Sequence, residues 1–183
     1  MENRYTMKKI STLFCAILLI SSCSSVKTFL DTKEGLEYKT KVKSDCPKDG
    51  TCDLMVFKNS SIQIQSDGLG HSYYDMVFDS GKTVIMYEYK KNTEGNYQDG
   101  HHTERIVFEI RNDITELFVE DLELSNLAMF YERHCFCKGE TGMFPINKGK
   151  LYVNNIGNTL KIDLRIDDVD IPFTISRVEA EIQ

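Results

Sequence analysis

The chain lacks the features that mark most enzymes and nucleic-acid-binding proteins. Its 183 residues contain no Trp, and the acidic side chains (28) outnumber Lys and Arg (22), giving a formal net charge of -6. Nucleic-acid binding needs clusters of Lys and Arg, so this balance argues against such a partner. The chain also has no P-loop, no dinucleotide-binding Gly pattern and no His-Glu-x-x-His zinc motif. The sequence therefore favours a non-enzymatic role and predicts no bound cofactor.

The apolar run near the N-terminus is too short for a membrane-spanning helix. Residues 10–20 form this run, whereas a spanning helix needs about 20 apolar residues. Lys8 and Lys9 precede it, and Ser21-Ser22-Cys23 follows it. This order of positive charge, apolar core and small residues is typical of a secretory signal.

Residues 19–23, Leu-Ile-Ser-Ser-Cys, resemble the lipobox of bacterial lipoproteins. In that family the Cys becomes the first residue of the mature protein and carries acyl chains such as palmitate. The resemblance covers residues 7–23 alone, and it implies that Cys23 is lipidated and that the protein is attached to a membrane through this anchor. Its alternative is a plain signal peptide cleaved near Ser25.

The resemblance also implies a domain organisation and a location. Residues 1–22 are the signal peptide, residues 23–35 are the lipidated Cys and a tether, and residues 36–183 are a single β-rich domain. Ser24 follows the Cys, in place of the Asp that retains lipoproteins in the inner membrane. This implies sorting to the outer membrane of a Gram-negative bacterium, and the lack of an acidic cluster after Ser24 favours the periplasmic face over the cell surface.

The mature region alternates between apolar and polar residues with the period of β-strands. In residues 159–167, Leu160, Ile162, Leu164 and Ile166 face one way and charged residues face the other. Similar runs recur every 10 to 15 residues and predict an all-β fold, an antiparallel sandwich or barrel of about nine to eleven strands. The sandwich ranks first, because lipocalin barrels carry a Gly-x-Trp motif and this chain has no Trp.

Two segments make the strand pattern less regular. Asp79-Ser80-Gly81-Lys82 predicts a hairpin turn between residues 73–78 and 83–89. Residues 112–122 fit either a short helix capped by Asp113 or an edge strand through residues 117–119.

Four cysteines remain after Cys15 in the signal and Cys23 at the anchor, namely Cys46, Cys52, Cys135 and Cys137. An even number in an exported domain indicates disulfides, and four cysteines allow three pairings. In an extended strand, the Cα atoms of Cys135 and Cys137 would lie about 6.5–7 Å apart, at the limit for a disulfide. The favoured prediction is therefore two long-range bonds that link the 46/52 pair to the 135/137 pair.

A local Cys46–Cys52 bond would leave a functional pair at Cys135 and Cys137. This pair would then be a strained disulfide, a redox dithiol or a set of metal ligands. His134 is adjacent and His101-His102 lie together in a loop, and thiolates with imidazoles suit Zn²⁺ or Cu(I). In a strand, however, His134 points away from both cysteines, and no metal site is predicted.

Three functions follow in order of preference. The first is a lipid-anchored binding or interaction module of the cell envelope, with an unknown protein or small molecule as its ligand. The second is a metal-binding or thiol-redox protein that uses Cys135 and Cys137, and the third is a small carboxylate-dependent hydrolase. The acidic run at residues 167–170 is interpreted as a solvated turn, and the tyrosines at positions 73, 74, 87 and 89 as packing residues.

Overall fold

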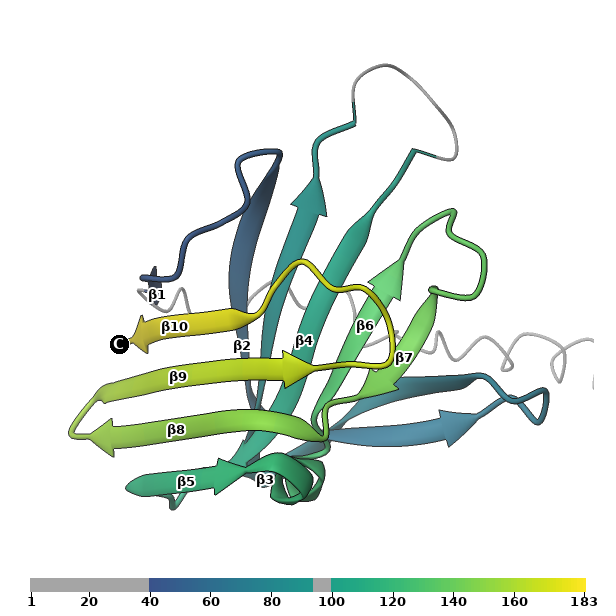
Figure 1. The fold of residues 1–183 in the computed structure, drawn as a ribbon. Coiled ribbons are helices and arrows are strands. Elements are labelled where there is room, and N and C mark those ends of the chain that lie inside the picture. Colours follow the sequence, from purple (N-terminus) through teal and green to yellow (C-terminus); the bar gives the residue numbers. More distant parts are fainter. Residues whose placement is uncertain (1–39, 94–99) are drawn as a thin grey trace, which may run out of the picture. The chain divides into compact units, whose positions relative to one another are not determined.

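The computed structural model describes residues 40–93 and 100–183 of the chain. The predicted signal, the lipidated Cys23 and the tether lie outside the described residues. Within them, ten strands form two five-stranded antiparallel sheets that enclose a common core (Figure 1). The prediction of an all-β antiparallel sandwich is confirmed.

Each sheet draws strands from both halves of the domain. The β9 sheet has the order β1 (Thr40–Val42), β10 (Arg177–Ile182), β9 (Thr159–Asp168), β8 (Lys148–Ile156), β5 (Glu116–Glu120). The β4 sheet has the order β2 (Gly50–Ser66), β3 (Ser72–Lys91), β4 (Thr103–Arg111), β6 (Phe130–His134), β7 (Gly142–Pro145).

The core lies between the inner faces of the two sheets, where period-two alternation places the apolar side chains. In β9, Ile162, Leu164 and Ile166 are buried, as their spacing predicts. The β4 sheet contributes alternate residues of β3 and β4, with Tyr87 and Phe108 among the largest fully buried side chains. Each such side chain contributes about 1.5–3 kcal/mol through burial.

The β2–β3 hairpin is longer than the sandwich and folds back over it. The pairing register shifts between Lys58 and Ser60, where Asn59 adopts a left-handed φ of 55°. Beyond this point, the distal half of the hairpin (residues 60–66 and 72–78) turns away from the proximal half (Figure 1). Ile62 and Tyr74 then form a second apolar cluster with Phe130 on the outer face of the β4 sheet.

Two local predictions have different outcomes. The prediction of a hairpin turn at residues 79–82 is wrong. Strand β3 runs through this segment as a bulge opposite Asn59, and the turn between β2 and β3 lies at residues 67–71. The edge-strand alternative for residues 112–122 is confirmed by β5, and a 3-10 helix, η2 (Asp121–Leu127), follows it. Among the described residues, no helix combines the length and apolar character needed to cross a membrane.

Candidate functional site

Both disulfides of the described domain are local. Cys46 bonds to Cys52 and Cys135 bonds to Cys137, so the predicted long-range bonds between the two pairs are wrong. The prediction failed because β6 ends at His134 and the chain bends at once, instead of continuing as a strand. The bend brings the Cα atoms of Cys135 and Cys137 to 5.2 Å, within the normal range for a disulfide.

The two disulfides have different surroundings. Cys46 and Cys52 pack against the main core, and the Tyr89 ring lies so close to Gly50 that a Cβ there would be 2.3 Å from it. This disulfide is therefore part of the packed scaffold at the start of β2.

Cys135–Cys137 lies in the loop between β6 and β7, apart from both apolar clusters. Its sulfur-bearing residues are half-buried, and Phe136 between them is 89% exposed. A disulfide that closes a three-residue loop restricts the unfolded chain by only about 1.6 kcal/mol in the chain-entropy model. Stabilisation is thus a weak reason for this bond to exist.

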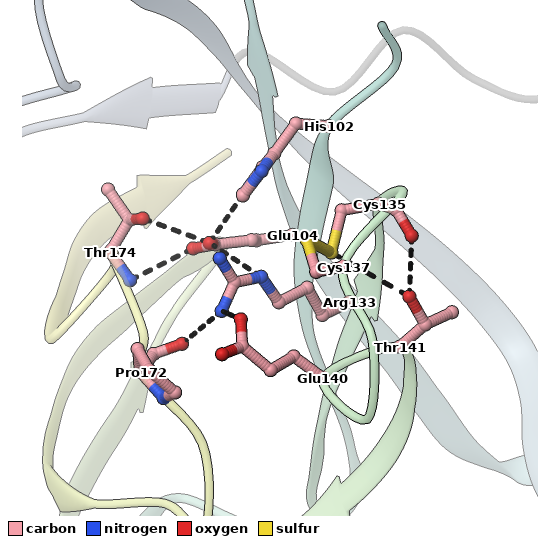
Figure 2. The surroundings of a disulfide bond; sticks show 9 residues. All are labelled: His102, Glu104, Arg133, Cys135, Cys137, Glu140, Thr141, Pro172 and Thr174. Carbon is pink, nitrogen blue, oxygen red and sulfur yellow. Dashed lines mark hydrogen bonds and ion pairs between the residues drawn. A yellow bond between two sulfur atoms is a disulfide. The ribbon is translucent and has the colours of Figure 1, made fainter. Parts of the chain in front are cut away.

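A buried carboxylate, Glu104, lies beneath this loop (Figure 2). His102 Nε2 lies 2.7 Å from Glu104 Oε1, and Thr174 donates from its backbone N–H at 3.0 Å and from its hydroxyl at 2.9 Å. The Tyr131 hydroxyl also donates to Glu104. Burial opposes ionisation, but these donors outweigh it and hold the pKa of Glu104 below its usual value of 4.5. Glu104 is therefore ionised at neutral pH.

Arg133 connects this carboxylate to the disulfide loop. Its Nε lies 3.6 Å from Glu104 Oε1, and its Nη1 reaches Glu140 at 3.2 Å and the carbonyl of Pro172 at 2.5 Å. Glu140 belongs to the loop that follows Cys137, so one side chain joins loop and interior (Figure 2). Thr141 holds the other side of the loop, because its hydroxyl donates to the carbonyl of Cys135 at 2.6 Å.

His102 is the imidazole that meets the cysteines. One of its ring nitrogens and the sulfurs of Cys135 and Cys137 all lie within 4.8 Å of one another. His134 is adjacent in sequence but pairs with Glu132 at 3.0 Å, and His101 is exposed. The sequence offered three histidines as candidate ligands, and among the described residues the structure brings only His102 to the cysteines.

The sequence contained a sign of the buried network that the prediction of alternating strands did not use. Glu104 has the same parity as Ile106 and Phe108, and Arg133 has the same parity as Tyr131. A charged residue on the apolar face of a strand must find partners inside the fold. Glu104 and Arg133 were therefore recognisable as members of an internal polar site.

The remaining candidate residues have structural roles. Asp167 accepts a hydrogen bond from Arg165 at 2.9 Å and Asp168 accepts one from Lys148 at 2.8 Å, at the exposed end of β9. Tyr87 and Tyr89 are buried in the core, and Tyr74 packs on Phe130. These contacts confirm that Asp167 and Asp168 are solvated, although both lie in β9 and not in the predicted turn. They also confirm these three tyrosines as packing residues, whereas Tyr73 is 45% exposed and its hydroxyl donates to Gln65.

A shallow groove of about 710 Å³ crosses the outer face of the β9 sheet. It is lined by the aromatic rings of Phe118 and Tyr152, which are opposite each other in the β5–β8 pairing. Its carboxylates are engaged by arginines, since Arg177 bonds to Asp163 and Arg165 bonds to Asp167.

The chain matches no family model, and comparisons with curated proteins and with solved structures found no match either.

Proposed function

We propose that this protein is a thiol–disulfide redox protein of the bacterial cell envelope, with Cys135–Cys137 as its exchanging disulfide. The observation that carries the proposal is the position of this bond: an accessible loop with His102 beside both sulfurs. Exposed disulfides are in general easier to reduce than buried ones and include the regulatory and catalytic cases. Two disulfides in the domain also fit the export that the lipobox resemblance implies, because such bonds persist in oxidising compartments.

The proposed reaction is the oxidation of a dithiol in another exported protein. A substrate thiolate attacks one sulfur of Cys135–Cys137, the disulfide breaks, and a mixed disulfide forms while the other protein sulfur leaves as a thiolate. The substrate's second thiolate then attacks the mixed disulfide and releases the second protein sulfur. Two electrons and two protons pass from the substrate dithiol to Cys135 and Cys137, and a disulfide of the envelope's thiol-oxidising system restores the protein.

His102 has a defined part in this exchange. A ring nitrogen within 4.8 Å of both sulfurs is close enough to accept the proton that the substrate thiol gives up and to return it to the departing thiolate, directly or through one water. The His102–Glu104 hydrogen bond orients the ring for this transfer.

The test is a redox titration that treats the two disulfides separately. The protein is equilibrated in glutathione buffers between roughly -300 and -150 mV, its free thiols are alkylated, and each cysteine is quantified by peptide mass spectrometry. The midpoint potential of Cys135–Cys137, at which half of the molecules are reduced, should lie above about -240 mV. Cys46–Cys52 should stay oxidised throughout and serves as the internal control. Equal resistance of both bonds throughout this range would refute the proposal.

A second experiment tests exchange with a substrate. C135S and C137S each retain one sulfur and cannot resolve a mixed disulfide internally. Incubated with the disulfide-linked dimer of a one-cysteine peptide, which releases its second peptide thiol into solution, at least one of them should accumulate a stable mixed disulfide, whereas C135S/C137S should not.

The interaction module is a second candidate, and the outer groove of the β9 sheet favours it. Phe118 is 58% and Tyr152 is 38% exposed there, beside the charges of Arg165 and Arg177. Aromatic rings and arginines are enriched where proteins bind partners. A photo-crosslinking residue at position 152 should capture one envelope protein, whereas the same residue at position 41, at the other edge of the sheet, should not. Within the described domain, the hydrolase alternative gains no support, because the groove carboxylates are bound by arginines.

A further inference from the structure

We propose that reduction of Cys135–Cys137 creates a binding site for a soft metal ion, Cu(I), held by the two thiolates and by His102. The inference rests on the proposed function in one respect, since it requires the pair to exist as a dithiol. It adds a bound metal ion to the site and gives His102 a second role, as a residue that coordinates this ion.

The three donors come together through the fold. His102 precedes β4, the cysteines follow β6, and the β4–β6 pairing sets Thr103 opposite His134. The donor atoms already lie within 4.8 Å of one another. Around a three-coordinate ion with bonds of about 2.0–2.3 Å, donor atoms lie roughly 3.5–4 Å apart. Reduction lets the sulfurs separate to this spacing, so small side-chain rotations complete the site.

The hydrogen bond to Glu104 selects the nitrogen that binds the metal. His102 Nε2 lies 2.7 Å from Glu104 Oε1, so the carboxylate already occupies this nitrogen. Nδ1 is the ring nitrogen that is left for a metal. A carboxylate behind a metal-bound imidazole is the usual arrangement in protein metal sites, where it fixes both the tautomer and the ring orientation.

The donor set favours Cu(I) over harder ions. Thiolates select Cu(I) and Zn²⁺ among the common protein metals. Zn²⁺ is tetrahedral, so with the three donors of this cluster it would need a water or another molecule as its fourth ligand. Three donors satisfy Cu(I), which accepts low coordination numbers.

The test uses the full chain in mild detergent, reduced with dithiothreitol and desalted without oxygen. Cu(I) is delivered from its bicinchoninate complex, and the loss of that complex's colour measures transfer to the protein. The wild type should take one Cu(I) per chain. The affinity of H102A should be at least about 10–100-fold lower, because losing a direct ligand should cost no less than losing an outer-shell partner, which costs that much.

The chain supplies matched controls for each donor. H101A and H134A change neighbouring histidines outside the cluster and should bind as the wild type does. C135S/C137S should bind no Cu(I) at this affinity, which also excludes binding at Cys46 and Cys52. Urea unfolding of each variant confirms that lost binding does not reflect lost structure.

Two outcomes would overturn the inference: binding by the wild type no tighter than by C135S/C137S, or equal binding by H102A and the wild type. Failure here is separable from failure of the proposed function. A pair that exchanges with glutathione but takes no Cu(I) leaves the redox proposal standing. A pair that resists glutathione but binds Cu(I) after stronger chemical reduction supports the metal site alone.

Discussion

At the residue scale, the site depends on one buried charge. Glu104 is fully buried on the apolar face of β4, where an unpaired carboxylate would be strongly destabilising. Its donors come from three parts of the chain: His102 beside it in sequence, Tyr131 in β6 and Thr174 in the β9–β10 connection. Burial and the neighbouring Glu104 raise the pKa of Tyr131, so its phenol stays protonated and remains a donor. Glu104 therefore joins the two sheets at the end of the sandwich that carries the disulfide loop.

E104Q should lower the free energy of unfolding at neutral pH by about 2–4 kcal/mol, because it replaces a charged acceptor in a buried network. Urea denaturation gives this value. The control is E140Q, since Glu140 contacts Arg133 from a partly exposed position and should cost less than about 1 kcal/mol. Similar losses in both variants would contradict the role assigned to Glu104.

The same variant predicts a pH dependence. The pKa of Glu104 is below 4.5 in the folded state, so its contribution is fully present above the unfolded pKa and is lost as the pH falls through the folded value. The stability difference between the wild type and E104Q should therefore be constant above about pH 4.5 and narrow below it. Urea unfolding from about pH 7 to pH 3 measures this, and a difference that persists to pH 3 would contradict the prediction.

At the element scale, the β2–β3 hairpin shows how a polar contact sets the direction of a long strand pair. Glu109 in β4 accepts hydrogen bonds from the Ser61 hydroxyl at 2.7 Å and the Ile62 backbone N–H at 2.9 Å, and it pairs with Lys82 at 2.5 Å. These contacts lie where the hairpin bends at Asn59. Glu109 thus holds the distal half against the outer face of the β4 sheet.

E109A should release the distal hairpin while the sandwich stays folded. Amide hydrogen exchange should accelerate in residues 60–66 and 72–78, with little change in residues 50–58 of the same strand. D75A is a suitable control, because the Asp75 carboxylate accepts a hydrogen bond from Gln65 on the exposed surface. This bond lies within the distal half of the hairpin and does not connect it to the β4 sheet. Uniform acceleration along all of β2 would show that the two halves open as one unit.

At the scale of the whole molecule, the two disulfides differ in how closely they are tied to the folded core. Cys46–Cys52 closes a seven-residue loop that packs on the core, whereas Cys135–Cys137 closes a three-residue loop at the surface. We therefore expect that Cys135–Cys137, the bond proposed to exchange, can open while the domain stays folded.

Removing each disulfide tests this division. C46A/C52A should lose about 2.4 kcal/mol from the chain-entropy model and more from lost packing, whereas C135A/C137A should lose at most about 1.6 kcal/mol. Urea denaturation measures both variants. A larger loss in C135A/C137A would make that disulfide a structural bond and weaken the redox proposal.

The proposed anchor is also a property of the whole molecule. C23A removes the sulfur that the lipobox resemblance assigns to lipid, and without acyl chains the protein should lose stable membrane attachment. Fractionation of cells, with labelled palmitate as a second readout, should show the wild type in membranes and C23A outside them. Membrane retention of C23A would contradict lipidation at this position.

The sequence by itself determined the all-β class and the inward side chains of β9, because side-chain alternation is a local property that each strand shows alone. It left residues 112–122 open between a short helix and an edge strand. It also singled out the four cysteines that form the disulfides, although the bonding that it favoured was wrong. Only the tertiary structure decided how they bond, because the answer depends on β6 ending at His134, one residue before the first cysteine. The choice of His102 over His101 and His134 likewise required the pairing of β4 with β6. That pairing joins residues about thirty positions apart, so it arises from the packing of the whole sheet and leaves no mark in the local pattern of either strand.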